Sequence, residues 1–568
     1  MTPTCTALLL VHCCIASHGL FMRPTNTYAD NVDQWLSSVD AELHEFNKLS
    51  AGLAWRMMME DVNETVLEMG AALGAAKSTW RNGVCDVALV HLQLAASNGR
   101  VCLQGEPDLE DLMSRDDLTA DQLSWLWKSW HNAAGPRVKA YYPDLVKILN
   151  QGARSYQDIG QVWREELDMP NLENIVKNLY QEIEPLYKML HAVVRYELVQ
   201  KYGPKVVDPV GPIPAHLLGN MWAQDWSALL GLLIPEDQNL HLDQRIASKN
   251  WTIKDMVQIA EDMYVSLGLP KMTEKFWKHS KFERNEKNSS LCHGTAANMF
   301  DEDDYRMLVC AEINMEDFYV IHHEMGHIEY YMAYSEQPAL FQDGANSAFQ
   351  ESVGDAVMTG VMVPQHLHRL GLLSDRQLLD KQLDTVLLVQ EALAKIPQIP
   401  YALLIDSYRW DIFNGKIKLN FYNEAFWKLS KTLRGILPPE PRGEQYFDAG
   451  AKFHVSDNTP YIRYFFSAIL QMEMFKGLCE LTLYGKLPEV RDQPVPFSLH
   501  RCDIYGSKKA GAQLKKMMQL GASENWQEAL KLLTGKSFIS AKPLLEYYQP
   551  VYEWLRGRII EKNIPVGW

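Results

Sequence analysis

Hydrophobic residues recur at the three- and four-residue spacing of an α-helix along most of the chain. One such stripe runs from Val32 to Phe46, and similar stripes run through residues 171–202 and 461–485. Runs in which β-branched residues alternate with polar ones are scarce. This periodicity predicts a mainly α-helical protein.

Clusters of Pro and Gly at residues 211–214 and 437–441 interrupt the helical pattern. Neither cluster is long or polar enough to act as an interdomain linker, and the chain contains neither an internal repeat nor a low-complexity segment. A chain of 568 residues that is 47% hydrophobic can bury a large core. We therefore expect one large helical domain, residues 20–568, behind the segment 1–19 discussed below.

The most specific pattern lies on one predicted helix. Asn314 is a typical N-cap residue, and it precedes acidic residues in the first turn. His323 and His327 stand four residues apart, so their imidazoles project from one face and can bind one Zn²⁺. Glu324 projects beside the metal, where it can take a proton from a bound water. His322 points about 100° away from His323 and is expected to pack, not to bind metal.

A second predicted helix supplies a third ligand. Ser347 and Gln350 form a capping-box pattern at its start, and Glu351 follows in its first turns. Asp355 lies four residues later on the same face, where it can hold the other ring nitrogen of His323. The alternatives are a chance His-Glu-x-x-His match and a solvated acidic face. The combination favours one zinc ion per chain, with a fourth position open for water and substrate.

The charge balance excludes one class of partner. The net charge is −16, from 55 basic and 71 acidic residues, and no basic run is interleaved with aromatic residues. Binding to nucleic acid is therefore not expected.

Residues 6–17 form a short apolar stretch that is followed by small residues around Ser17 and Gly19. They resemble a secretory signal peptide, although no Lys or Arg precedes them; a buried N-terminal strand or helix is the alternative. No other stretch approaches the roughly 20 apolar residues of a membrane span, and residues 561–568 offer no anchor. We therefore expect a secreted, extracellular protein with no membrane anchor.

Cysteine usage agrees with secretion. Of nine Cys residues, three lie in the predicted signal peptide and six remain. Six Cys can pair in fifteen ways, and we expect pairs of sequence neighbours, namely Cys85–Cys102, Cys292–Cys310 and Cys479–Cys502. Sequons for N-glycosylation occur at Asn63, Asn250 and Asn288.

Several motifs together resemble the peptidyl-dipeptidase A family, the angiotensin-converting enzymes, from about residue 25 to the C-terminus. They are His322-His-Glu-Met-Gly-His327, Glu351-x-x-Gly-Asp355, residues 213–224, Cys292-His293, Lys452-Phe-His454 and Pro460-Tyr-Ile-Arg-Tyr464. The resemblance implies a gluzincin-like helical ellipsoid, divided by a deep cleft under an N-terminal helical lid. It also implies a monomeric zinc peptidase that releases C-terminal dipeptides from oligopeptides with a free C-terminal carboxylate.

The resemblance assigns further catalytic roles. Tyr464 and His454 match positions that stabilise the tetrahedral oxyanion, for which a phenol and an imidazole are suitable donors. His293 matches a residue that hydrogen-bonds the substrate backbone. Gly294 stands where the family usually has Ala; only its carbonyl is needed, so we expect little effect. Without these neighbours, Tyr461 and Tyr464 would be interpreted as core tyrosines on one helix face, after a helix start at Thr459-Pro460.

Lys452, Tyr461 and Gln224 match the set that binds the substrate's C-terminal carboxylate. One cation and two neutral donors make a sensible anion site, whereas a single Lys is more often solvated. Within the family, a relative that acts as a carboxypeptidase has Arg at the position of Gln224. Gln leaves room for two residues, so we expect a dipeptide product.

Chloride binding is where the chain departs from the family pattern. At the first chloride site, His131 and Ser430 stand in place of two arginines, so this site is expected to be lost. At the second site, Arg463 is retained but Leu167 replaces a tyrosine partner. Whether chloride binds at this one site is left open.

Three alternatives to the dipeptidase remain. They are a metallocarboxypeptidase that removes one residue, an endopeptidase of another His-Glu-x-x-His clan, and a catalytically silent relative that binds or transports peptides. Loss of a zinc ligand or of Glu324 would favour the silent relative, and all of these residues are present.

Overall fold

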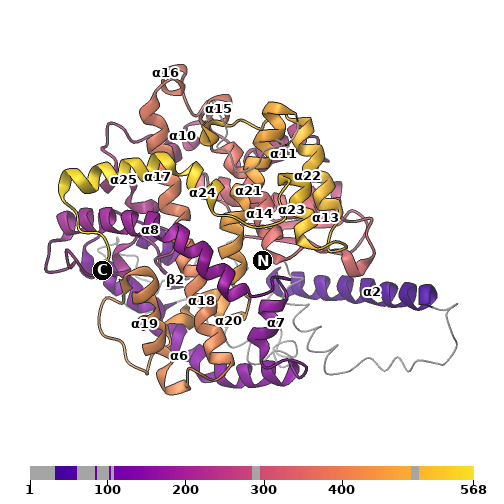
Figure 1. Ribbon diagram of the computed structural model, residues 1–568, viewed down its shortest axis with the longest axis horizontal. Coiled ribbons are helices and arrows are strands. Elements are labelled where there is room, and N and C mark those ends of the chain that lie inside the picture. Colours follow the sequence, from indigo (N-terminus) through magenta and orange to yellow (C-terminus); the bar gives the residue numbers. More distant parts are fainter. Residues whose placement is uncertain are drawn as a thin grey trace.

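The computed structural model describes residues 32–59, 84–85, 102–103, 108–283, 294–485, 487 and 498–568. The predicted helical character is confirmed (Figure 1). The longer helices are α2 (Val32–Met59), α6 (Ala120–Gly152), α8 (Leu172–Tyr202), α11 (Ile253–Leu267), α13 (Met315–Ala333), α14 (Ser347–Val361), α17 (Lys381–Lys395), α18 (Gln398–Phe413), α19 (Tyr422–Arg434), α21 (Ile462–Tyr484), α22 (Lys508–Gln519), α23 (Trp526–Thr534) and α25 (Gln549–Lys562). The stripes expected at 171–202 and 461–485 correspond to α8 and α21.

β-Structure is limited to three two-stranded sheets within the described residues. Two of them are antiparallel: β1 (Val84–Cys85) with β2 (Cys102–Leu103), and β4 (Thr295–Asn298) with β5 (Tyr305–Leu308). The third pairs β3 (Ile213–Pro214) with β6 (Ile436–Leu437) in parallel. These last strands belong to the two Pro/Gly clusters, which therefore do more than interrupt helices. Their pairing places the segment that leads to residue 224 beside the end of α19.

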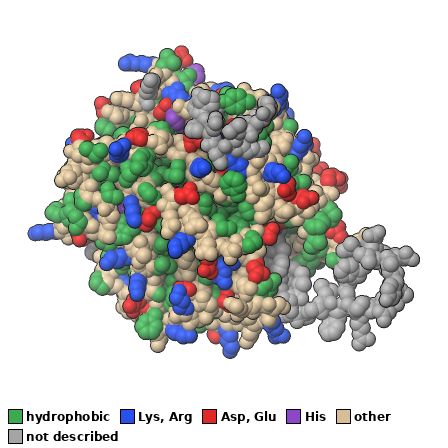
Figure 2. Space-filling view, viewed as in Figure 1, with side chains coloured by type: hydrophobic (Ala, Val, Ile, Leu, Met, Phe, Trp, Pro, Cys, Tyr) green, Lys and Arg blue, Asp and Glu red, His purple; other side chains and the backbone are tan. Residues whose placement is uncertain are grey.

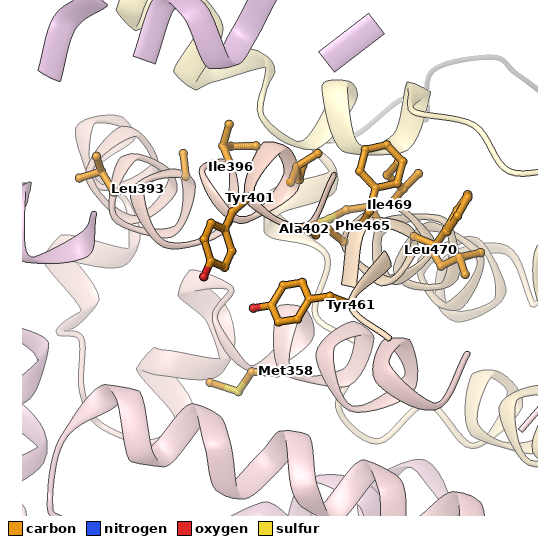
Figure 3. Close-up of a cluster of buried hydrophobic side chains, with 14 of the residues drawn as sticks. Met358, Leu393, Ile396, Tyr401, Ala402, Tyr461, Phe465, Ile469 and Leu470 are labelled. Carbon is orange, nitrogen blue, oxygen red and sulfur yellow. The ribbon is translucent and has the colours of Figure 1, made fainter. Parts of the chain in front are cut away.

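Helix α21 forms the centre of the core. It is hydrophobic on nearly all sides, and its residues from Ile462 to Arg463 and from Phe465 to Leu481 are buried, as expected for a helix that other elements surround. It packs against α14, α18, α22, α23 and α24 (Lys542–Tyr547). Figure 3 shows part of this core, which includes Met358 of α14, Leu393 of α17 and Tyr401 of α18 together with Phe465 and Ile469 of α21.

Helix α2 lies at the margin of the molecule (Figure 1) and packs against β4. Its Ala51 and Trp55 share a buried cluster with Phe300 and Leu308 of the β4–β5 hairpin, and Lys48 forms an ion pair of 3.0 Å with Asp301. The stripe that predicted this helix is only partly buried, because Phe46 remains 40% exposed.

One predicted helix start is wrong by one residue. The N-cap of α14 is Asn346, whose side chain accepts hydrogen bonds from the backbone N–H groups of Ala348 and Phe349. Ser347 is instead the first helical residue. Asn and Ser are about equally good N-caps, so their succession leaves the start ambiguous in the sequence. The predicted N-cap of α13, Asn314, is confirmed by its bond from the Asp317 N–H.

The disulfide Cys479–Cys502 is present and joins α21 to the segment before α22. Cys310 is also disulfide-bonded; its expected partner, Cys292, lies outside the described residues. Strands β1 and β2 place Cys85 and Cys102 opposite each other in register, and their pairing stays a prediction.

The predicted signal peptide, Asn63, Asn288 and His293 lie outside the described residues, whereas Asn250 is described and exposed. Within the described residues, no helix has the length and apolar character needed to cross a membrane. Figure 2 shows acidic and basic side chains interspersed over the visible face.

Candidate active site

Two glycines allow helices α13 and α14 to cross at backbone contact. A Cβ atom on Gly326 would lie 2.3 Å from the Cα of Gly354, and a Cβ on Gly354 would lie 2.4 Å from the carbonyl oxygen of His323. Both distances are far below van der Waals contact, so no other residue type fits without moving a helix. This close crossing brings Glu351 of α14 to the histidines of α13.

The three predicted metal ligands form a compact triangle. The Nε2 atoms of His323 and His327 are 3.2 Å apart, and Glu351 Oε2 lies 3.5 Å from the first and 3.7 Å from the second. In a tetrahedral zinc site with bonds of about 2.0–2.2 Å, ligand atoms stand about 3.3–3.6 Å apart. The donor set of two imidazoles and one carboxylate therefore fits Zn²⁺ in both chemistry and spacing.

Acceptors on α14 orient both imidazoles. His323 Nδ1 donates to Asp355 Oδ1 at 2.7 Å, and His327 Nδ1 lies 3.4 Å from Gln350 Oε1. Each ring thus turns its Nε2 atom towards Glu351, as metal-binding histidines require. Gln350 was expected only in a capping box, so its place at this site was missed.

The carboxylates give the site a strong preference for positive charge. Burial lowers the pKa of His323, but Asp355 and Glu351 outweigh burial and raise it to about 10. Burial raises the pKa of Glu351, but the hydrogen bond with His323 and the charges of both histidines bring it to about 2. A divalent cation would replace the proton on His323 and interact with the same carboxylates.

A partly buried cation, Lys395, contacts the second oxygen of Asp355. Lys395 Nζ of α17 lies 3.3 Å from Asp355 Oδ2 and also contacts the hydroxyl of Tyr319. One turn earlier on α17, burial raises the pKa of Glu391 to about 7, although a hydrogen bond of 2.7 Å from Tyr547 acts in the opposite direction. These residues belong to no local motif, so sequence reasoning did not find them.

Glu324, the predicted general base, is buried next to Gly294. A Cβ atom at position 294 would lie 3.3 Å from Glu324 Oε1 and only 2.7 Å from Val320 Cγ1. The expectation that Gly and Ala are equivalent here is therefore too simple, because Ala would require Val320 to shift.

His454, Tyr461 and Tyr464 are assembled at the start of α21. His454 Nε2 lies 3.2 Å from the Tyr464 hydroxyl, and the two tyrosine rings are 4.7 Å apart. The helix begins at Ile462, not at the predicted Thr459-Pro460. Asp406 of α18 caps it from outside by accepting the N–H groups of Tyr461 and Ile462 at 2.7 and 2.6 Å.

Asp406 is itself fixed by Arg409, with which it forms a fully buried ion pair. Arg409 also donates to the backbone carbonyls of His454 and Thr459. One buried ion pair therefore sets both the start of α21 and the position of His454. Neither residue was predicted, because the contacts join segments far apart in the sequence.

The predicted carboxylate-binding residues also converge. The Tyr461 hydroxyl donates to Gln224 Oε1 at 3.2 Å, and Lys452 Nζ lies 3.8 Å from the ring centre of Trp222. The backbone carbonyl of Ala451, next to Lys452, accepts hydrogen bonds from the indoles of Trp130 and Trp222. Gln224, Lys452 and Tyr461 thus come from two distant segments that the structure holds together.

The residues at the family's chloride positions fit an anion poorly. Burial lowers the pKa of His131 to about 4, so this ring, stacked on Trp127, is neutral at physiological pH. Ser430 donates to the carbonyl of Ile436. Arg463 lies 3.7 Å from Glu166 Oε1, which already offsets its charge.

Substitution Gly354→Ala should test the helix crossing. We expect a loss of zinc affinity of at least about tenfold, because a Cβ that meets a backbone oxygen must push α14 and Glu351 away from the histidines. Titration of the metal-free protein with zinc gives the affinity. Gly360→Ala on the same helix is the control, since its Cβ would meet only the side chains of Ile504 and Phe475. Equal zinc affinity in Gly354→Ala and the wild type would contradict this account.

Comparison with known proteins agrees with the geometry. The family model described as angiotensin-converting enzyme matches residues 28–568. Angiotensin-converting enzyme from Mesocricetus auratus is 37% identical over 90% of this chain and 37% of its own length. The enzyme from Theromyzon tessulatum is 37% identical over 80% of this chain and 73% of its own. The chain spans little more than a third of the length of the enzymes from Mesocricetus auratus and Sus scrofa. The chain belongs to the angiotensin-converting enzyme family.

Proposed function

We propose that the protein is a zinc-dependent peptidyl-dipeptidase that releases dipeptides from the free C-terminus of oligopeptides. The observation that supports this most directly is the triangle formed by His323 Nε2, His327 Nε2 and Glu351 Oε2, with edges of 3.2, 3.5 and 3.7 Å. The gathering of Gln224, Lys452 and Tyr461 supplies the substrate specificity that a metal site alone lacks.

Zinc held by this triangle would polarise the scissile carbonyl and lower the pKa of a water molecule towards neutrality. Glu324 takes the proton from the attacking water and then returns it to the leaving amine. Its burial strengthens these interactions by excluding bulk water. Tyr464 and His454 donate hydrogen bonds to the developing oxyanion.

The position of the cut depends on where the substrate's C-terminal carboxylate is held. Lys452 supplies the charge, while Tyr461 and Gln224 supply neutral donors. Because Gln224 is shorter than Arg and uncharged, it leaves space for two substrate residues between the carboxylate site and the metal. A dipeptide product follows.

The proposal also covers where the protein is located, its oligomeric state and its partners. A signal-like segment, paired cysteines and sequons at Asn63, Asn250 and Asn288 support a secreted glycoprotein. We also propose that it acts as a monomer. Its partners would be peptides, not nucleic acid, in accord with the net charge of −16.

Substitution Glu324→Gln should lower kcat by at least about a hundredfold, because the general base is lost, while one zinc ion per chain is retained. Digests of a free-acid peptide, analysed by mass spectrometry with and without a chelator, give rate and product together. Glu316→Gln serves as the control, since Glu316 is exposed in the first turn of the same helix.

The same digests separate the alternatives. Removal of single residues would indicate a metallocarboxypeptidase, and internal cuts would indicate an endopeptidase. Binding without any cleavage would indicate a catalytically silent relative. Substantial hydrolysis by Glu324→Gln would refute the role of this residue.

Activity should be unchanged by chloride when ionic strength is held constant. His131 is neutral, and Arg463 is already paired with Glu166, so neither position offers an uncompensated buried cation. The measurement is kcat/KM in chloride and in acetate at equal ionic strength. An increase of about fivefold or more in chloride would show that an anion site exists.

A further inference from the structure

Arg434, the last residue of α19, is a buried cation without a carboxylate partner. Its exposure is 2%, and within the described part of the chain no acidic side chain lies at ion-pair distance from it. Two other buried arginines differ in this respect, since Arg409 pairs with Asp406 and Arg442 pairs with Asp448, whereas Arg195 likewise has no ion-pair partner among the described residues. The feature is unusual because an unpaired charge in the interior is costly.

The surroundings of this guanidinium are aromatic. Burial lowers the pKa of Arg434, and the groups that act in the opposite direction are the hydroxyls of Tyr187, Tyr401, Tyr180 and Tyr461. The guanidinium lies 4.8 Å from the ring centre of Tyr401. An aromatic face offsets only part of the charge of a cation above it. The remaining positive charge of Arg434 can therefore attract a nearby anion.

Arg434 holds the turn that presents Gln224. Its Nη2 atom donates to the carbonyls of Trp222, at 3.2 Å, and Ala223. Ala223 adopts a left-handed backbone conformation, with φ of 53°, which costs a non-glycine residue about 1 kcal/mol or more. The indole of Trp226 donates to the same carbonyl of Ala223 at 3.1 Å. The next residue is Gln224, so this strained turn sets the direction of its side chain.

Arg434 also contacts Tyr461, the other neutral donor of the carboxylate site, through the ring of Tyr401. The ring of Tyr401, against the guanidinium, meets the ring of Tyr461 edge-on, with centres 5.6 Å apart and planes at 88° (Figure 3). Tyr461 in turn donates to Gln224. Both neutral donors of the carboxylate site are therefore held by contacts that lead back to Arg434.

We propose that Arg434 is a positioning residue for Gln224 and Tyr461, and that its unpaired charge attracts the carboxylate of the substrate. This inference rests on the proposed function. A purely structural role is the alternative, since a cation at the C-terminal end of a helix interacts favourably with the helix dipole. The positioning role and the purely structural role predict different effects on substrates with and without a C-terminal charge.

The test compares one peptide as its free acid and as its C-terminal amide, with the wild type and Arg434→Gln. Gln keeps a donor near the Ala223 carbonyl and removes the charge. We expect KM for the free acid to rise about tenfold, the size expected for one charge acting through a partly polar interior. We expect kcat to change less than about twofold and the amide to be affected little. Arg434→Lys should restore much of the lost preference for the free acid.

Arg195→Gln is the matched control. Arg195 is also buried and also donates to backbone carbonyls, those of Gly211, Pro565 and Gly567, but it has no contact with the carboxylate site. The substitution Arg195→Gln should lower Tm without changing the preference for the free acid over the amide. If Arg434→Gln does not fold, Tyr401→Leu tests the same coupling, with an expected rise in KM of about threefold for the free acid only.

The outcomes separate this inference from the function on which it rests. Absence of dipeptide release by the wild type would overturn the proposed function. Release by the wild type, with the preference for free acid over amide unchanged in Arg434→Gln, would leave the function standing and overturn the role of Arg434. Equal losses on both substrates, with a lower Tm, would show a structural role only.

Discussion

Gly326 and Gly354 allow α13 and α14 to touch backbone to backbone, and the other features of the metal site depend on that contact. It places a carboxylate from one helix within 3.5 Å of an imidazole on the other. It also brings Asp355 and Gln350 to the outer nitrogens of the same two rings. Ligands and their supporting acceptors thus come from one crossing of two helices, which limits how far any of them can move independently.

Buried and partly buried ion pairs fix the elements around this helix crossing. Lys395 lies behind Asp355, and the pair Asp406–Arg409 fixes the start of α21 from α18. Breaking such a pair leaves an uncompensated charge in the interior, which costs more than the pair contributes. The pair Asp406–Arg409 also fixes positions, because Asp406 accepts the N–H groups of Tyr461 and Ile462. Arg434 is buried without such a partner, and we propose that its charge acts on the carboxylate of the substrate.

The sequence predicted most of what is local. Helical periodicity indicated the fold class, and the spacing of His323, His327 and Glu351 selected residues that the structure brings together. The N-cap of α14 could not be decided between Asn346 and Ser347, since both residue types suit that position. The start of α21 was misplaced because its cap, Asp406, comes from another helix.

The features that the sequence could not predict are tertiary contacts. Lys395, Asp406 and Arg434 carry no spacing signal, and each acts through a segment distant in the chain. Gly294 illustrates the same limit: only the packing of Val320 shows that a methyl group there would be crowded. Such residues can be recognised as part of the site only when the structure shows them next to a motif.

The central claim is that two imidazoles and one carboxylate bind a single zinc ion. X-ray absorption at the zinc edge, on purified protein of known metal content, tests it most directly. The account predicts one zinc per chain, with two imidazole nitrogens and carboxylate oxygen among its ligands. A site with sulfur ligands, or protein that takes up no stoichiometric zinc, would contradict it.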